Sequence, residues 1–476
     1  MPVVEVSDVE LFDDTLAFAR QWWDPEAAML WNPDGAFPEF TAGRTLHQIP
    51  NSAWFAWSLL ATGDPADEAD AIRAIEAVLA LQYDAPGAEY DGTFRQFLEW
   101  PQTPPDDATM WEDFDPNWRQ FVGTTFALIL EDFGDRLGDD LNLRVFEACR
   151  RAALGEPDGR IPTSYTNPAL MRAWLDAWVG SRAGLPDLLA RGETFAQRIV
   201  DRFDRLGTFD EFNSPTYYGM DLYALSFWQI FGPTPLFREQ GRRLSLAIWS
   251  EMLDFYSPDL RNWAGPYTRS YGPDVTRSVA KAGVWFWAEF GRDRAPLPPL
   301  TADVHHGHDL TSGSVIARLH RRVTADLPGG CDRRVPRRVE AIIEDRFVVS
   351  DIGQDLMIGT ESSDHDWGGW DQFMPFVAHW RAGDDVETLW LAGPRVLHAD
   401  LEPAKATLRV EETDEIVLHL RADECRVASG RIDTGHRVIA IDQPMSLELG
   451  DHDGWTIRIA ASEATLDFHP ASVGQI

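Results

Sequence analysis

Two segments of the chain combine amide, phenol, carboxylate and guanidinium groups in a way that suggests acid–base chemistry. The first covers residues 209–221, FDEFNSPTYYGMD, and ends at the entrance to a predicted helix. The second covers residues 262–274, NWAGPYTRSYGPD, where Arg269 lies between two tyrosines in a turn rich in glycine and proline. A tyrosine beside an arginine can serve as a base, because the cation favours the phenolate. These two segments are therefore the leading candidates for a catalytic site.

Three shorter segments have a similar character. They are residues 46–52 (LHQIPNS), 115–119 (DPNWR) and 162–168 (PTSYTNP). Each lies at the start of a predicted helix, where an Asn, Asp or Ser side chain can simply cap the helix. If the fold brings the ends of these helices together, all five segments could line one polar and aromatic cleft.

The elements that would position these segments are helical up to about residue 292. Apolar side chains such as Ile49, Trp54 and Trp57 recur at intervals of three and four residues. Breakers such as Asp64-Pro65 and Ser257-Pro258 separate the helices. The pattern predicts helices over residues 8–23, 45–62, 67–83, 117–133, 139–154, 167–181, 186–204, 217–231, 236–256 and 274–290. Helical hairpins without a fixed repeat length predict an α-solenoid or a closed (α/α) toroid over residues 1–293.

A proline-rich linker is predicted over residues 294–304, because its closely spaced prolines cannot continue a helix. Beyond it the apolar period becomes two. Short alternating runs bounded by turn residues predict strands, for example over residues 314–320, 338–343, 415–420 and 455–459. We therefore predict an antiparallel β-sandwich over residues 305–476.

Acidic residues far outnumber basic ones in this chain. There are 77 Asp and Glu against 42 Lys and Arg, a net charge of −35, and only Lys281 and Lys405 are lysines. Phosphate backbones and anionic membranes would repel such a chain, so nucleic-acid and membrane partners are not expected. The charge excess runs along the whole chain, which indicates a solvated surface, as in a halophilic archaeon or a GC-rich bacterium. The 44% of hydrophobic residues is ample for folded cores.

The cysteines and the N-terminus indicate a cytoplasmic protein. Cys149, Cys331 and Cys425 are odd in number and far apart, unlike a disulfide framework or a zinc cluster. The N-terminus has neither a basic region nor an apolar segment of a secretory signal. His305, His306 and His308 could ligate a metal, but a histidine cluster without a distant complement is weak evidence, so we expect no cofactor.

A helical region followed by a β-sandwich resembles the (α/α)-toroid polysaccharide lyases, especially the heparinase II/III-like and alginate-lyase-like groups. The segment EFNSPTYYG, residues 211–219, is similar in character to the Asn- and Tyr-bearing start of their catalytic helix. The motifs NSPTYYG and GPYxRxYG also look like those of a less characterised family. The resemblance covers the architecture of nearly the whole chain. It implies a closed toroid and an enzyme that acts on a small saccharide.

The resemblance implies cleavage of a uronic-acid glycoside by β-elimination. In this reaction the substrate carboxylate is neutralised, a base removes the C5 proton, and an acid protonates the departing O4. Asn213 and Arg269 would neutralise the carboxylate, and Tyr217 or Tyr218 would do acid–base work. Adjacent helical side chains point about 100° apart, so only one of the pair would face the cavity, and Tyr218 is slightly favoured. The other implied catalytic residues are Tyr271 and His47, and the implied substrate-binding residues are Asn117, Trp118, Tyr165, Asn167, Tyr267, Glu211, Asp221 and His365.

Three other functions fit the same sequence. A glycoside hydrolase on a toroid would need two carboxylates, which Asp115, Glu211, Asp221 and Asp274 could supply. A toroid dehydratase, isomerase or cyclase would use some of the 20 tryptophans to line a pocket for a terpenoid-like substrate. A non-catalytic protein could bind carbohydrate by stacking exposed aromatic rings on sugars.

Overall fold

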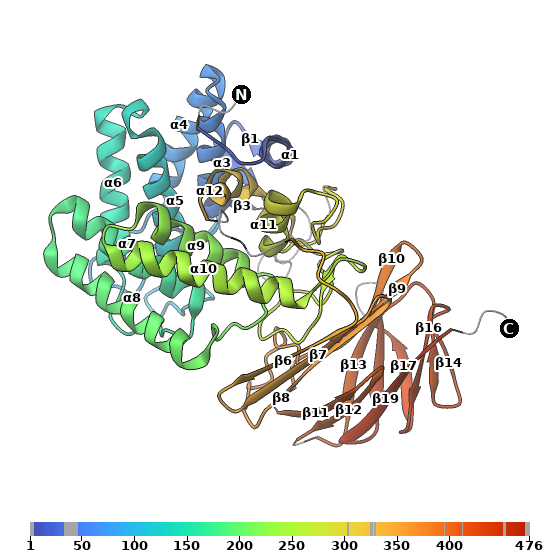
Figure 1. The fold of residues 1–476 in the computed structure, drawn as a ribbon. Coiled ribbons are helices and arrows are strands. Elements are labelled where there is room, and N and C mark those ends of the chain that lie inside the picture. Colours follow the sequence, from blue (N-terminus) through green and yellow to red (C-terminus); the bar gives the residue numbers. More distant parts are fainter. Residues whose placement is uncertain are drawn as a thin grey trace. The chain divides into compact units, whose positions relative to one another are not determined.

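The computed structural model describes residues 4–32, 46–301, 304–323, 327, 330–394, 396–411, 413–450 and 454–471 (Figure 1). Residue 45 of a predicted helix and residues 302–303 of the predicted linker lie outside this part. The chain forms two compact units. Unit 1 comprises Met1–Arg205, Gly219–Ala247 and Arg277–Leu327, and unit 2 comprises Leu206–Tyr218, Ile248–Thr276 and Pro328–Ile476.

The predicted helices are all present. In the described part of the chain the α-helices are α1 (Val9–Arg20), α3 (Ile49–Thr62), α4 (Pro65–Leu79), α5 (Trp118–Phe133), α6 (Gly138–Leu154), α7 (Thr166–Ala183), α8 (Pro186–Leu206), α9 (Tyr217–Phe231), α10 (Pro235–Phe255), α11 (Lys281–Phe290) and α12 (Gly313–Val323). Local signals set several of their ends. Asp64 caps α4 by accepting a bond from the Ala66 N–H at 2.7 Å, and Gly63 and Gly184 end α3 and α7 in the left-handed conformation.

Buried and half-buried helices alternate along unit 1. Nearly every residue of α7 from Thr166 to Gly180 is buried, and α3 is buried in the same way from Ile49 to Ala61. In contrast, α4 and α6 bury only one face. A helix that is apolar all round belongs in the interior of a protein, while a one-sided helix covers it. The alternation therefore gives hairpins of an inner and an outer helix.

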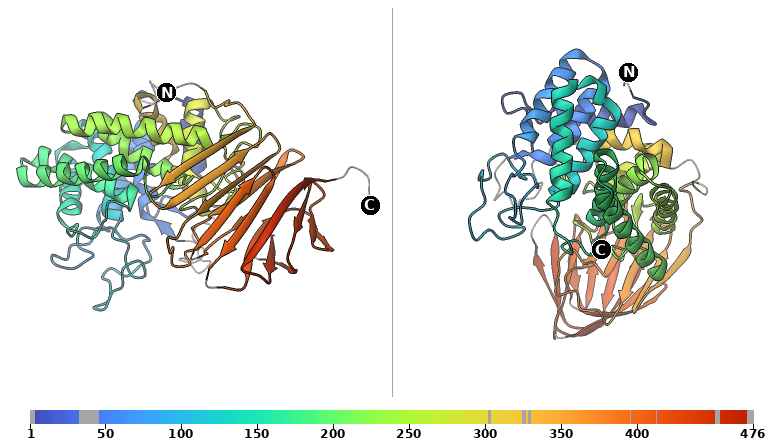
Figure 2. Two further views of the ribbon diagram at one scale, coloured as in Figure 1. Left: turned by 60° about the horizontal axis from the view of Figure 1, so that its bottom comes forward. Right: turned by 90° about the vertical axis from the view of Figure 1, so that its left-hand side faces the viewer.

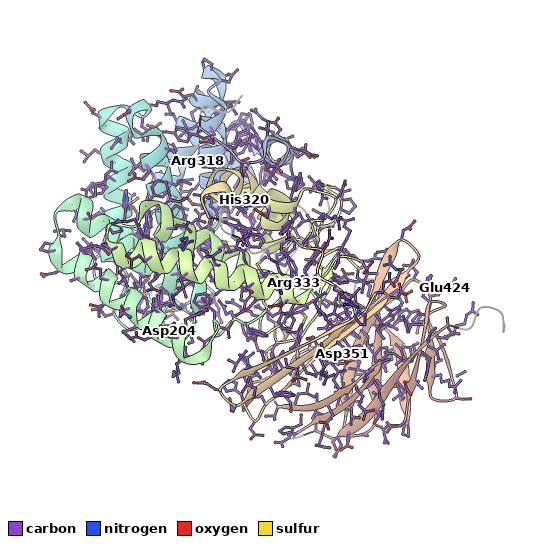
Figure 3. The ribbon with its side chains drawn as sticks, viewed as in Figure 1. Asp204, Arg318, His320, Arg333, Asp351 and Glu424 are labelled. Atoms are coloured by element: carbon purple, nitrogen blue, oxygen red, sulfur yellow. The ribbon has the colours of Figure 1, made fainter. Side chains whose placement is uncertain are left out.

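The strand predicted at residues 314–320 is wrong, because these residues belong to α12. Val315, Ile316 and Leu319 are buried on this helix, which packs against α1 and α11. The helix also carries Arg318 and His320, which are labelled in Figure 3, and both side chains have partners in unit 1. Arg318 pairs with Asp132 at 2.8 Å and His320 pairs with Glu289 at 2.7 Å. These tertiary contacts decide between the two readings of a short mixed run.

Among the described residues, unit 2 contains two large antiparallel sheets (Figure 2) and a short antiparallel pair of strands, β4 (Tyr256–Ser257) and β5 (Asn262–Trp263). The eight-stranded sheet has the order β17 (Met445–Leu449), β18 (Trp455–Ile459), β13 (Ile416–Arg421), β10 (Asp385–Leu391), β9 (Phe376–Ala382), β8 (Leu356–Ser362), β7 (Arg346–Ile352) and β6 (Arg337–Ile343). The six-stranded sheet has the order β11 (Leu397–Glu402), β12 (Lys405–Val410), β19 (Glu463–Pro470), β16 (Arg437–Ile441), β15 (Arg431–Asp433) and β14 (Arg426–Ala428). Trp380 and Leu418 of the first sheet share one core with Leu408 and Phe468 of the second. This is the predicted antiparallel β-sandwich.

The loop that carries Arg269 lies on the eight-stranded sheet within unit 2. Ser350 of β7 donates to the Gly265 carbonyl at 2.6 Å, and a Cβ at Gly359 of β8 would lie 1.7 Å from that same oxygen. Tyr267 and Met374 exchange backbone hydrogen bonds of 2.9 and 3.0 Å. A rigid sheet therefore holds this loop at several points. Among the described helices, none has both the length and the apolar character needed to span a membrane.

Candidate active site

Arg269 is the centre of a charged and aromatic cluster in unit 2. Its guanidinium Nη1 contacts Glu211 Oε1 at 2.6 Å, and its Nε donates to Gln372 Oε1 at 3.0 Å. The guanidinium carbon lies 3.8 Å from the ring centroid of Tyr217 and 5.1 Å from that of Trp370. Such close stacking is a cation–π contact, which holds the guanidinium over the phenol ring.

The hydroxyl of Tyr217 meets the hydroxyl of Tyr271 at 2.6 Å. One of these phenols donates to the other, and a phenolate on the acceptor would be stabilised by both that bond and the neighbouring guanidinium. Tyr217 is largely buried, whereas Tyr271 is partly exposed. The pair therefore joins the phenol of a buried residue to that of a partly exposed one.

Tyr218 follows directly in α9 but meets a different environment. Its hydroxyl donates to Glu251 Oε2 at 2.5 Å, and Thr208 Oγ1 donates to the same carboxylate oxygen at 2.9 Å. Burial, together with the negative charge of Glu251, raises the pKa of Tyr218 well above its ordinary value. Burial also raises the pKa of Glu251 to about 7, although the hydrogen bonds from Tyr218 and Thr208 oppose this effect. Tyr218 thus lies beside a carboxyl group whose pKa is raised to about 7.

Asn213 holds the two segments together. It adopts a left-handed backbone conformation with φ 49°. Its side-chain amide donates to the carbonyls of Ala264 at 2.8 Å and Pro266 at 2.9 Å, so both amide hydrogens are engaged. The neighbouring Ser214 accepts a bond from the Tyr217 N–H at 3.1 Å and donates to the Arg269 carbonyl. These bonds join the start of α9 to the Arg269 loop.

A second arginine supports the same loop from β7. Arg346 makes a two-pronged ion pair with Glu361 at 2.8 and 2.7 Å, and it also donates to the Thr268 hydroxyl. Its guanidinium lies 5.1 Å from the ring of Trp367, which stacks on Phe373 at 4.5 Å. Because Arg346 is buried, this paired charge fixes the position of Thr268, next to Arg269.

Among the helix starts of unit 1, Asn117 and Tyr165 are brought together. The Asn117 amide donates to the Tyr165 hydroxyl at 2.8 Å and accepts from Arg160 at 3.0 Å. Arg160 in turn pairs with both oxygens of Glu156 at 2.7 and 2.8 Å. Tyr165 is partly exposed, and its hydroxyl is linked through Asn117 and Arg160 to the buried carboxylate of Glu156.

His47, the predicted second base, lies in unit 1 in strand β3 (His47–Gln48) rather than in a helix. Its Nδ1 contacts Glu99 at 2.7 Å and its Nε2 contacts Asp24 at 3.1 Å. The ring also stacks on Trp31 with centroids 3.5 Å apart. Both ring nitrogens are therefore already engaged with carboxylates.

The three histidines considered as metal ligands lie close together in unit 1. His306, His308 and Asp309 place one ligand atom each within 4.8 Å of the others, and all three residues are buried. His305 is exposed and bonds the Ser278 hydroxyl at 2.9 Å. Lys281 forms an ion pair with Asp309. A His-His-Asp cluster is thus present, with a lysine at its carboxylate.

The remaining predicted site residues have varied surroundings. The Tyr267 hydroxyl donates to the Trp263 carbonyl at 2.6 Å, and burial raises its pKa well above the ordinary value. Asp221 and Asn167 are buried in their helices, and Trp118 packs on Phe121 at 5.1 Å. His365 is exposed, with its ring 4.5 Å from that of Trp367.

Sequence reasoning missed Glu251, Gln372 and Trp370. Glu251 lies within α10, where a glutamate normally faces solvent, and Gln372 and Trp370 lie about a hundred residues beyond the loop that they contact. No local pattern marks any of them. The aromatic stretch around Trp367 and Trp370 was the one available signal.

Comparison with known proteins gives a family and a fold. The model of the family described as "Domain of unknown function (DUF8769)" matches residues 9–321. No curated protein sequence matches the chain. Among solved structures, "Crystal Structure of Heparinase III" is similar with a TM-score of 0.52 at 10% identity, over 98% of this chain and 86% of that chain.

Two further solved structures are similar at lower scores. Heparan sulfate lyase HepC from Pedobacter heparinus has a TM-score of 0.38 at 10% identity, over 89% of this chain and 76% of that chain. Endoglucanase CelQ from Clostridium thermocellum complexed with cellotetraose has a TM-score of 0.32 at 10% identity, over 99% and 93%. The likeness to heparinase III confirms the predicted fold class, a helical toroid followed by an antiparallel β-sandwich.

Proposed function

This chain belongs to the DUF8769 family, and we propose that it is a carbohydrate-active lyase that cleaves uronic-acid-containing oligosaccharides by β-elimination. The observation that carries the proposal is the phenol pair of Tyr217 and Tyr271, 2.6 Å apart, beneath the guanidinium of Arg269. Removal of a carbon-bound proton needs a strong base and a nearby cation, and this cluster supplies both. The similarity of fold to heparinase III supports the same reaction class.

Each step of the reaction has a group that can perform it. Arg269 neutralises the substrate carboxylate, which makes the C5 proton more acidic. A phenolate on Tyr217 or Tyr271 accepts that proton, and the electron pair of the broken C–H bond forms the C4–C5 double bond. The C4–O4 bond breaks, and the oxygen leaves with a proton from the second phenol. Exposed Trp370 would stack on the sugar ring next to Arg269.

The surroundings change two of the expected roles. We assign the acid–base work to Tyr217 rather than to Tyr218, because the hydroxyl of Tyr218 is buried against a carboxyl group. We assign Asn213 to holding the loop, because both of its amide hydrogens bond backbone carbonyls and none is left for a substrate carboxylate. Arg269 then remains as the group that neutralises the substrate.

The proposal is tested with a panel of uronic-acid oligosaccharides. A lyase creates a conjugated unsaturated uronate, so ultraviolet absorbance should rise together with new chain ends. Tyr217→Phe should lower kcat by about 10²–10⁴-fold, the usual contribution of a general acid or base. Tyr90→Phe is the matched control, since Tyr90 packs against Tyr83 and Phe114 in unit 1. If Tyr217→Phe and Tyr271→Phe both keep full activity, the assignment is wrong.

Glu251 favours a glycoside hydrolase as the second candidate. A hydrolase needs two carboxyl groups, one of which stays protonated near neutral pH, and Glu251 would be the protonated one because burial raises its pKa to about 7. Such an enzyme would release reducing sugar without any ultraviolet product. It would also lose turnover in Glu251→Gln and keep it in Tyr217→Phe, which is the reverse of the result expected for the lyase.

A further inference from the structure

The second cluster of chemical interest lies entirely within unit 1, at the turn before α12. His306 precedes the 3₁₀-helix η2 (Gly307–Ser312), which contains His308 and Asp309. The three residues are only 5–6% exposed, and their ligand atoms lie within 4.8 Å of one another. Two imidazoles and a carboxylate converging at this distance are a familiar donor set for transition metals.

The backbone around these donors is held firmly. The His308 carbonyl accepts bonds from the Asn51 amide at 2.8 Å and from the Thr311 hydroxyl at 2.7 Å, and the Ser312 hydroxyl donates to the Asp309 carbonyl at 2.8 Å. His306 adopts the left-handed conformation with φ 56°, which is unfavourable for a residue that has a Cβ atom. Strain of this kind persists where the surrounding structure fixes the side chain in a particular direction.

A cation already occupies the carboxylate of the cluster. The Lys281 ammonium pairs with Asp309 Oδ1, and it lies 4.6 Å from the ring centroid of Trp54. His308 Nε2 is 3.6 Å from the same oxygen. Lys281 is one of only two lysines among the 42 basic residues of the chain. The Asp309 carboxylate therefore holds a compact positive charge, and a metal ion at this cluster would compete with the Lys281 ammonium for it.

We propose that His306, His308 and Asp309 bind a divalent transition-metal ion of the zinc type, which displaces the Lys281 ammonium from Asp309. Three protein ligands leave a fourth position open for water or for an oxygen of a small molecule, as in zinc sites that do chemistry. The exchange breaks one ion pair and forms three metal–ligand bonds. Because the ammonium competes for the carboxylate, the wild-type affinity is lower than that of a variant without the lysine.

The proposal is tested by direct binding to the full chain after dialysis against a chelator. Calorimetry with Zn²⁺ and visible absorption with Co²⁺ should each give one site per chain, and the Co²⁺ bands should have the intensity typical of four-coordinate sites. His308→Ala and Asp309→Asn should each weaken binding by about a hundredfold or more, because each removes a direct ligand. Lys281→Met should tighten it by about tenfold.

A surface histidine provides the control. His398 of β11 lies beside Glu411 at 3.2 Å and Asp364 at 3.6 Å, so it is the rival place for a metal to bind adventitiously. His398→Ala should leave both titrations unchanged. Circular dichroism establishes that each variant is folded. The titration of the wild type tests the presence of a metal site even if a variant does not fold.

Three results would overturn the proposal. The wild type could bind no Zn²⁺ or Co²⁺ at millimolar concentration. Folded His308→Ala and Asp309→Asn could bind with the wild-type affinity, or the site could be lost in His398→Ala instead. Weaker binding by Lys281→Met would overturn the displacement of the lysine.

Discussion

Glu251 gives the sharpest quantitative prediction, because burial raises its pKa from 4.5 to about 7 in the folded protein. A carboxyl group whose pKa is higher in the folded than in the unfolded state binds more protons when folded. Its contribution to stability is therefore fully present at low pH, and it is lost as the pH rises from about 4.5 to about 7. The stability therefore falls with rising pH through this group, whereas a salt-bridged carboxylate makes stability rise with pH.

The magnitude follows from the difference between the two pKa values. At about 1.4 kcal/mol for each tenfold change in proton affinity, the free energy of unfolding should fall by about 3 kcal/mol between pH 4 and pH 8 through this group alone. Glu251→Gln removes the titration but keeps an oxygen that can accept the bonds from Tyr218 and Thr208. The variant should thus gain stability relative to wild type as the pH rises.

The assay is urea unfolding of both proteins at several pH values, read as the difference between wild type and variant. Taking the difference cancels the titration of every other group. Glu239→Gln, at an exposed position of the same helix α10, is the control for replacing a helical glutamate by glutamine. A Glu251→Gln difference that is flat between pH 4 and 8, or one that falls with pH, would refute the reasoning.

Three substitutions test the scaffold of the proposed site by urea unfolding. Asn213→Gly should lower the free energy of unfolding by about 1–2 kcal/mol, because the side-chain hydrogen bonds are lost. Asn213→Ala should lower it by about 1 kcal/mol more, because alanine is strained at φ 49°. Equal losses of stability in the two variants would contradict this explanation. Gly359→Ala should lower the free energy of unfolding by about 3 kcal/mol or more, the upper range for overpacking, because its Cβ would lie 1.7 Å from the Gly265 carbonyl oxygen. Unchanged stability of this variant would be incompatible with that contact. Arg346→Lys should cost about 1–3 kcal/mol because an ammonium cannot make the two-pronged pair with Glu361, and wild-type stability would argue against that pair.

Much of the fold could be predicted because helix periods and breakers are local. The exceptions have identifiable causes. The helix predicted from residue 274 begins at Lys281, because Asp274 accepts bonds from the Thr276 N–H at 2.9 Å and from its hydroxyl, and so forms a turn in place of the first helical turns. Residues 314–320 read equally as strand or helix, and packing against α1 and α11 selects the helix.

The candidate site could be predicted only for residues that lie within segments of unusual composition. The sequence marks residues 209–221 and 262–274 as two of five candidate segments, and the structure brings Arg269, Glu211, Tyr217 and Tyr271 of these two segments together. Glu251 could not be found in this way, because its unusual proton affinity comes from burial by residues distant in sequence. A glutamate in a helix carries no local sign of what will cover it.

The two adjacent tyrosines show how the fold divides acid and base character. The phenols of Tyr217 and Tyr218 are chemically identical and belong to the same helical turn, yet one lies against the guanidinium of Arg269 and the other against the carboxyl of Glu251. A cation favours the phenolate, whereas burial beside a carboxyl group favours the neutral phenol, and the raised pKa of Tyr218 reflects this. Catalytic sites often separate acid from base through such contrasting environments. The helix supplies the angle between the two side chains, and the partners from the loop and from α10 decide which phenol can lose its proton and then act as a base.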